Sequence, residues 1–334
     1  MILQTLKQGF SKVNRTKRMV FFAWMLNVTA ALALTLPLFS QLNDYLRETV
    51  QAEALVDQFS ANWYQTWQID MEGSELTPYV NYTIFGYAPF LNHTEAVLGG
   101  TIVKAVGKFF YTLIVHQSFT APDLLTMLTF LYVLVSTFLA GAFIGMYAKD
   151  YRLSFTEFLM EGAKYFGRFF RLSLLSLILY YILFLWIFDW ASGRIPVWTA
   201  NEPNELTPFI YHIVKNILVL FSLALVTMCV DYAKIRIVAE DRISALMALV
   251  AGARFALGNF RKTFGLYLLL TLLGFVLIAL YAFFEKLIPQ HSYGMIFLAF
   301  ILGQLYLMMR MWLKASFYAS QTTLFQSANG GNGI

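Results

Sequence analysis

Six long apolar runs dominate the pattern of hydrophobic and polar positions along the chain. They occupy residues 19–40, 124–147, 172–190, 209–230, 264–284 and 293–313. A helix needs ~20 predominantly apolar residues to cross the hydrocarbon core of a bilayer, and each run reaches or approaches that length. The pattern therefore predicts an all-α integral membrane protein with about six transmembrane helices.

The composition agrees with that class. Of the 334 residues, 59% are hydrophobic and 13% are charged, whereas a soluble chain has about 25% charged residues. The first apolar run follows a basic stretch, as in a secretory signal, but it is too long for the apolar region of such a signal and lacks a small-residue cleavage site. We therefore expect it to remain as the first span.

The basic residues predict the orientation of these helices. With the N-terminus in the cytoplasm, six spans place 18 of the 24 Lys and Arg residues on the cytoplasmic side. Such a bias near the ends of spans sets the topology of a membrane protein. Both termini are therefore expected in the cytoplasm.

The largest segment between spans, residues 41–123, is acidic and aromatic and is expected outside, in the periplasm. Within it, residues 96–115 are apolar enough for a seventh span, but Lys104 and Lys108 lie near the centre. Each lysine would cost roughly 2.5–3.5 kcal/mol at the bilayer centre. An interfacial helix on the outer surface is the favoured interpretation, and a seventh span is the alternative.

The chain repeats itself at an offset of 90 residues. Residues 149–171 (KDYRLSFTEFLMEGAKYFGRFFR) align without gaps on residues 239–261 (AEDRISALMALVAGARFALGNFR), with 7 of 23 positions identical and 4 more conservatively replaced. In each copy an amphipathic cytoplasmic helix joins two spans, and a serine, Ser154 or Ser244, stands at the position of its N-cap. Because two spans per copy give both copies the same orientation, we predict an internal parallel repeat.

The predicted organisation has five parts. They are a basic cytoplasmic N-tail with the first span (1–40), the outer region with its interfacial helix (41–123), repeat unit 1 with spans 2 and 3 (124–208), repeat unit 2 with spans 4 and 5 (209–290), and the sixth span with the cytoplasmic tail (291–334). The single cysteine, Cys229, lies in an apolar run, so no intramolecular disulfide joins these parts.

Charged residues near membrane depth are the strongest leads to a site, because they are costly there unless paired. Asp231 stands at the inner end of the fourth span with Lys234 one turn onward, and Arg310 stands near the inner end of the sixth. We expect an intramembrane ion pair between Asp231 and one of these cations, with a structural role favoured over a proton or substrate site. Gly141 and Gly145 form a Gly-x-x-x-Gly motif, which predicts close helix packing inside the protein or at a dimer face.

The first cytoplasmic helix carries basic and aromatic residues that suit a membrane surface. They are Lys164, Tyr165, Phe166, Arg168, Phe169, Phe170 and Arg171. Basic side chains bind anionic headgroups and aromatic rings enter the interface, so we expect the helix on the inner leaflet with all four rings in lipid. Nucleic-acid binding is disfavoured, because the stretch continues into a span. The second copy has fewer rings and is expected to be freer to contact protein.

Two segments resemble uncharacterised bacterial polytopic membrane proteins. They are STFLAGAFIGMYAKDYRLSFTEFLMEGAKYFGRFFRLSLL (136–175) and VDYAKIRIVAEDRISALMALVAGARF (230–255). They are similar, more distantly, to the membrane domain that accompanies some glycerophosphoryl diester phosphodiesterases, whose catalytic domain has no counterpart in this sequence. The resemblance covers about residues 130–285, concerns packing motifs, and implies a bacterial inner-membrane location without a known reaction.

The sequence favours a non-enzymatic function. It contains no Gly-x-Ser-x-Gly, His-Glu-x-x-His or P-loop motif, and its four histidines lack metal-ligand spacing, so we expect no catalytic, cofactor or metal site. The favoured hypothesis is a scaffold or accessory subunit of a membrane assembly, whose partners are anionic lipids, other membrane proteins or further copies of the chain. The alternative is a transporter or permease component for an apolar or lipid-like substrate.

Overall fold

A computed structural model of the chain describes residues 2–47, 55, 61–71, 124–149, 153–183, 188, 190–204, 206–289 and 292–330; most of these residues are helical, and no strand occurs among them. The helices are α1 (Ile2–Arg15), α2 (Lys17–Arg47), α4 (Ala61–Asp70), α7 (Leu124–Lys149), α8 (Phe155–Ile182), α9 (Trp190–Trp198), α10 (Leu206–Ala239), α11 (Ala245–Gly258), α12 (Phe260–Lys286) and α13 (Tyr293–Ala328). The predicted interfacial helix at 96–115 and most of the outer region lie outside the described residues.

Three helices, α10, α12 and α13, are each long and apolar enough to cross a membrane. Helix α2 becomes a fourth if its two halves, which bend apart between Leu32 and Thr35, form one span. Pro37 explains a bend at this place, because proline cannot donate to the carbonyl four residues earlier and its ring crowds that carbonyl. The membrane-protein class is thus supported, and the predicted runs 124–147 and 172–190 fall mainly on α7 and α8.

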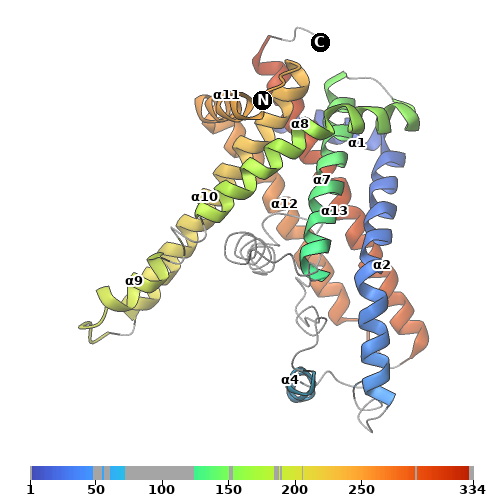
Figure 1. Cartoon of the computed structure of the whole chain (residues 1–334), viewed down its shortest axis with the longest axis vertical. Helices are drawn as coiled ribbons and strands as arrows, with labels where there is room; N and C mark the ends of the chain where they lie inside the picture. Colours follow the sequence, from blue (N-terminus) through green and yellow to red (C-terminus); the bar gives the residue numbers. More distant parts are fainter. Residues whose placement is uncertain are drawn as a thin grey trace, which may run out of the picture.

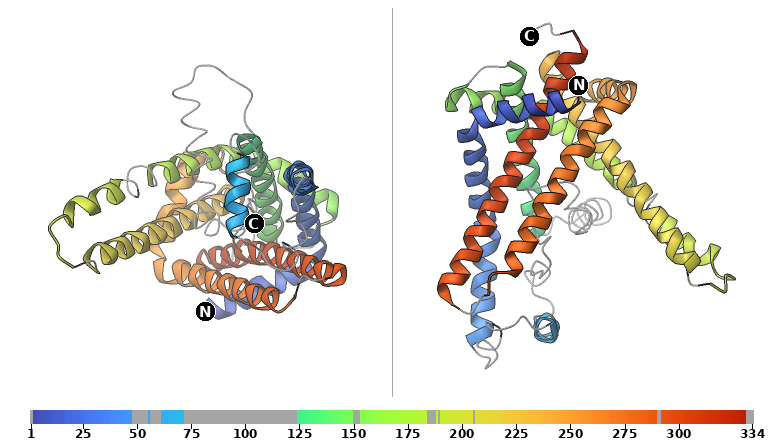
Figure 2. Two further views of the ribbon diagram at one scale, coloured as in Figure 1. Left: turned by 90° about the horizontal axis from the view of Figure 1, so that it is seen from below. Right: turned by 180° about the vertical axis from the view of Figure 1, so that it is seen from behind.

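The start of α1 and the end of α13 lie at one end of the molecule (Figure 1). This end consists of α1, α11, the last turns of α7, α10 and α13, and the first turns of α8 and α12; we call it the packed end. Helix α1 lies across α12 and α13 there (Figure 2). The core is concentrated here, with Phe158, Tyr232 and Ala319 among its fully buried members.

A separate arm leaves the bundle from the packed end. It consists of the second half of α8, α9 and the first half of α10 (residues 172–183, 190–204 and 206–223), and Figures 1 and 2 show it diverging from α12 and α13. Leu183, Val219 and Leu223 form a small core of its own, and the hydroxyls of Tyr180 and Thr227 lie 2.8 Å apart at its root. The arm is therefore held together mainly by α8 and α10.

The predicted serine N-caps are both present. Ser154 Oγ accepts from the backbone N–H of Glu157, and Ser244 Oγ accepts from that of Met247. The helices that follow differ, because α8 continues unbroken into the arm whereas α11 ends before Asn259 and α12 begins after it. Helix α8 thus runs without a break through residue 171, where the third span was expected to begin, because its sequence has no helix-ending residue at the corresponding place.

Candidate functional site

A buried polar cluster occupies the packed end where α10 meets α13. Lys234 Nζ lies 3.0 Å from Asp231 Oδ1, and their side chains are only 10% and 6% exposed. Gln321 Nε2 of α13 lies 3.5 Å from the second carboxylate oxygen, Asp231 Oδ2. Two of the three residues expected to form an ion pair are therefore brought together, and whether they lie at membrane depth stays a prediction.

Helix α13 adds a second cation and an aromatic ring to this cluster. The ring of Tyr318 has Lys234 Nζ at 5.9 Å from its centroid and Lys314 Nζ at 5.5 Å. Arg310, the third predicted member, lies with its guanidinium carbon 5.1 Å from the ring centroid of Tyr306. The structure thus places an aromatic ring beside each of these three cations, which lowers the cost of removing them from water.

The surroundings of the cluster are unusually polar for a helix interior. Ser320 and Thr322 are at most 1% exposed, and their hydroxyl oxygens lack hydrogen-bond partners, as does Tyr232 OH. An unmatched buried polar group typically costs about 1–3 kcal/mol. The part of the chain that the structure describes therefore concentrates its buried polarity here, on α10 and the last turns of α13.

The cluster holds charged groups of both signs close together. It combines one carboxylate with two ammonium groups, Asp231 with Lys234 and Lys314, in a protein-lined interior. Among the described residues no group of three or more His, Cys, Asp or Glu side chains is placed to hold a metal ion. The arrangement suits a structural ion pair within α10 that Gln321 and Tyr318 of α13 contact.

A second ion pair joins α7 to α8. Lys149 Nζ contacts Glu161 Oε1, and the carboxylate is 9% exposed whereas the lysine is 31% exposed. A Cβ atom added to Gly145 would stand 2.7 Å from Glu161 Oε2, and one added to Gly141 would stand 3.3 Å from the carbonyl oxygen of Gly162. Both glycines of the predicted packing motif therefore face α8 within the same chain, and Gly145 leaves room for the carboxylate.

The basic and aromatic residues of α8 divide between two faces. Tyr165 and Phe169 are 3% and 0% exposed and belong to the protein core. The expectation that all four rings enter lipid therefore needs correction, because these two face other helices at the spacing of one helical turn. Membrane contact stays a prediction for the others, namely Lys164, Phe166, Arg168, Phe170 and Arg171.

An exposed ion pair links α8 to the turn between α10 and α11. Arg168 Nη1 donates to Asp241 Oδ1 at 2.5 Å and holds the pKa of this carboxyl below its usual range. Asp241 adopts φ of 47°, a left-handed conformation that Asp, Asn and Gly tolerate best. One basic residue expected to bind lipid is thus engaged by protein.

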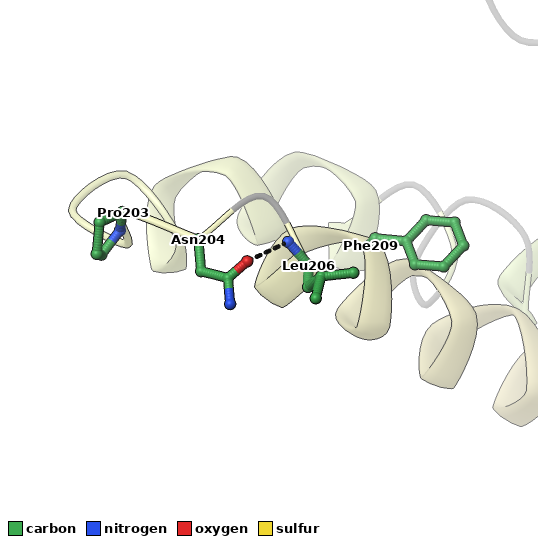
Figure 3. A pocket seen from close by; sticks show the side chains of 4 residues that line it. All are labelled: Pro203, Asn204, Leu206 and Phe209. Atoms are coloured by element: carbon green, nitrogen blue, oxygen red, sulfur yellow. Dashed lines mark hydrogen bonds between the residues drawn. The ribbon is translucent and has the colours of Figure 1, made fainter.

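A hollow at the tip of the arm is lined by fewer polar groups than the buried cluster. Pro203, Asn204, Leu206 and Phe209 surround a space of about 660 Å³ (Figure 3). Asn204 Oδ1 accepts a hydrogen bond from the backbone N–H of Leu206 at 3.0 Å, which forms a local turn just before α10. The polar group at this hollow is therefore explained by local structure.

Sequence reasoning missed the contribution of α13 to the polar cluster. Lys314, Tyr318 and Gln321 recur at steps of four and three residues, which places them on one helical face. That polar spacing near the end of an apolar helix was the available signal. Glu161 could likewise have been noticed as an acid on an otherwise basic and aromatic helix.

Comparisons with known proteins do not assign the chain to a class of protein, so only its fold indicates the class. No family model, curated protein or solved structure matches the chain. The described residues form a helical protein with three helices long and apolar enough to cross a membrane. The particular membrane, orientation and function are therefore matters for proposal.

Proposed function

We propose that this chain is a non-enzymatic polytopic protein of the bacterial inner membrane that serves as a scaffold or accessory subunit. The observation that carries the proposal is the arm, whose apolar surface is exposed where it leaves the rest of the protein. On α10 the exposed apolar residues are Phe209, Ile210, Ile213, Val214, Ile217, Leu218, Leu220 and Phe221. In a bilayer this surface can contact lipid or an apolar transmembrane helix of a neighbouring protein, and the scaffold proposal takes the second because the arm diverges from α12 and α13 (Figures 1 and 2).

Six spans with both termini in the cytoplasm remain the favoured topology. Helix α13 has 36 residues and is therefore ~54 Å long at 1.5 Å per residue, which exceeds the ~30 Å hydrocarbon core. Its buried part runs from Met311 to Phe325, whereas its first half is largely exposed and apolar. We place that first half in lipid and the packed end, with the basic N-terminal helix, on the cytoplasmic side.

A parallel repeat is also part of the proposal. The support is local: α8 and α11 begin at equivalent serines, and the equivalent glycines, Gly162 and Gly252, make close approaches to the preceding helix, α7 and α10 respectively. The resemblance to bacterial polytopic membrane proteins covers the same segments. It remains a prediction, as does the acidic outer region.

Site-specific crosslinking from the arm tests the scaffold function. A photoreactive residue at Ile217 should yield one defined protein adduct in native membranes, and the same residue at Leu272 of α12 should not. The two side chains are matched, at 60% and 50% exposure. The same partner should copurify in fixed stoichiometry in mild detergent and be lost with Ile217→Trp but not with Leu272→Trp.

A negative outcome is equally specific. If the protein purifies from its native host as a monodisperse species without a partner, and crosslinks from both positions reach only lipid, the scaffold function is wrong. Crosslinks between two copies of the chain would instead make the arm a homo-oligomer contact.

A transporter or permease component for a lipid-like substrate is the second candidate. The observation that favours it is an open groove of about 580 Å³ between α8 and the start of α11, lined mainly by aliphatic side chains. Reconstitution into liposomes with fluorescent phospholipids in one leaflet tests it. A rate of lipid exchange equal to that of protein-free liposomes would remove this candidate.

A further inference from the structure

The groove at the root of the arm combines one cation with an aliphatic surface. Arg171, Leu174, Leu175 and Ile178 line it from α8, and Ile243 and Leu246 line it from the opposite side. The α8 residues are spaced by three, one and three positions, so they follow one face of the helix for ~10 Å. Its volume of about 580 Å³ lies within the ~300–1,000 Å³ of small-molecule sites.

The polar and apolar parts of this groove are ordered along α8. Arg171 stands at the end nearer the packed end, and the aliphatic residues follow it into the arm. Leu174, Ile178 and Leu246 stay between 43% and 61% exposed, so an apolar occupant would remove further hydrocarbon surface from water. This order, one charged residue followed by aliphatic residues, matches the charged headgroup and hydrocarbon tail of an amphiphile.

The charge of Arg171 is not matched within the described protein. Its Nε donates to the carbonyl oxygen of Gly167 at 3.1 Å, and no carboxylate among the described residues pairs with it. Arg168, one turn earlier, is by contrast paired with Asp241. Ala245 and Leu246, in the first turn of α11, also line the groove, and the N-terminal end of a helix carries a partial positive charge.

We propose that this groove binds an anionic phospholipid of the inner leaflet, with the phosphate at Arg171 and an acyl chain along Leu174 and Ile178. The guanidinium of Arg171 complements the negative charge of the phosphate, and the aliphatic residues beyond it complement the acyl chain. The inference rests on the proposed placement of α8 at the cytoplasmic membrane surface. It needs no partner protein on the arm, so a failed crosslink from Ile217 would leave it standing.

The repeat offset of 90 residues supplies matched control variants. Arg261 corresponds to Arg171 and Leu268 to Ile178, and neither control residue lines the groove. Ile178 and Leu268 are also alike in exposure, at 46% and 45%. Substitution within each pair therefore separates binding in the groove from a general loss of surface charge or apolar surface.

The test is a native mass spectrometry titration of the full chain in mild detergent with dioleoylphosphatidylglycerol and dioleoylphosphatidylcholine. We expect tighter binding of the anionic lipid, a loss of about fivefold in Arg171→Gln, and no change in Arg261→Gln. Ile178→Gln should weaken both lipids, and Leu268→Gln neither. Arg171→Lys should retain most of the preference, and equal thermal unfolding midpoints would show that the variants are folded.

Three outcomes would overturn the inference. Equal affinity for the two lipids would remove the role of the charge, and equal losses in Arg171→Gln and Arg261→Gln would show non-specific attraction to a basic surface. Displacement of the anionic lipid by millimolar inorganic phosphate would show that the site takes free phosphate rather than a lipid headgroup.

Discussion

The helix pairs α7–α8 and α10–α11 are built from similar parts and end differently. In each, a helix reaches the packed end, a serine caps the next helix, and a glycine of that helix approaches the preceding one. In the first pair α8 then leaves the bundle as part of the arm. In the second pair the chain turns at Asn259, and α12 lies beside α13.

One position accounts for the different directions. Asn259 ends α11, and its Nδ2 donates to the carbonyl oxygen of Phe255 at 3.2 Å. Thr263 then secures the new helix, because its hydroxyl lies 2.8 Å from the carbonyl oxygen of Ala256 across the break. The corresponding residue in α8 is Phe169, which is fully buried inside a continuous helix. The buried Phe169 keeps α8 continuous, whereas Asn259 ends α11. The two similar segments therefore continue in different directions.

The two ion pairs should differ most in their contribution to stability. Asp231→Asn should lower the free energy of unfolding by about 3–5 kcal/mol, because Lys234 remains buried without its carboxylate. Glu161→Gln should cost about 1 kcal/mol or less, since Lys149 is 31% exposed and can turn toward water. Denaturant unfolding in mild detergent, followed by circular dichroism, measures both.

The double variant Asp231→Leu with Lys234→Met is the control for this prediction. Removing both charges together should restore most of the lost stability, because replacing a buried pair by apolar residues is often neutral. Equal losses of stability in Asp231→Asn and Glu161→Gln would contradict the predicted difference between the two ion pairs.

The equivalent glycines should tolerate a methyl group unequally. A Cβ atom at residue 252 would stand 2.5 Å from the backbone nitrogen of Ala233, so α11 must move away from α10. We expect Gly252→Ala to cost about 1–3 kcal/mol. At residue 162 the nearest atom, at 2.8 Å, belongs to the ring of Phe138, which can turn.

Gly162→Ala should therefore be nearly neutral, since alanine in a helix also gains roughly 0.5–1 kcal/mol over glycine. Thermal unfolding of both variants in the same detergent compares them. A larger loss at residue 162 would show that Phe138 is held more rigidly than the backbone contact of α11.

The two N-caps differ in completeness. Glu157 Oε2 accepts from the backbone N–H of Ser154 at 2.7 Å, which completes a capping box, whereas Met247 at the equivalent position has no group to reciprocate. Met247→Glu should therefore stabilise α11 by about 0.5 kcal/mol. Leu246→Glu, one residue earlier, is the control: it adds the same charge to the first turn without the reciprocal hydrogen bond, so it should stabilise less than Met247→Glu in the same unfolding measurement.

The ion pair between Arg168 of α8 and Asp241, which links the two helix pairs, should have the smallest effect on stability, and that effect depends on pH. The hydrogen bond from Arg168 lowers the pKa of Asp241, so this carboxylate stabilises the fold above its unfolded pKa of about 3.9 and loses that contribution as pH falls through the lower folded value. Asp241→Asn tolerates the same left-handed conformation without the charge. The stability difference between wild type and Asp241→Asn should be small at pH 7 and should shrink as the pH falls below about 3.9; a difference that does not change with pH in this range would assign it to another cause.

Local chemistry in the sequence determined much of this molecule. The apolar runs predicted the helices, the serines predicted both N-caps, and the predicted packing glycines, Gly141 and Gly145, lie against α8. Asp231 and Lys234 are three residues apart, so a helix alone brings their side chains within reach. These features depend on neighbours in sequence or on the absence of a side chain.

Only the tertiary structure decided which apolar surfaces face protein. Tyr165 and Phe169 are buried while Phe166 and Phe170 are not, and the polar face of α13 meets Asp231 through a contact 90 residues away in sequence. The direction in which the arm diverges from α12 and α13 was likewise decided only by the tertiary structure. The physical reason is that lipid tails are as apolar as a protein core, so in a membrane helix hydrophobicity alone does not distinguish a face that packs on another helix from one that faces lipid.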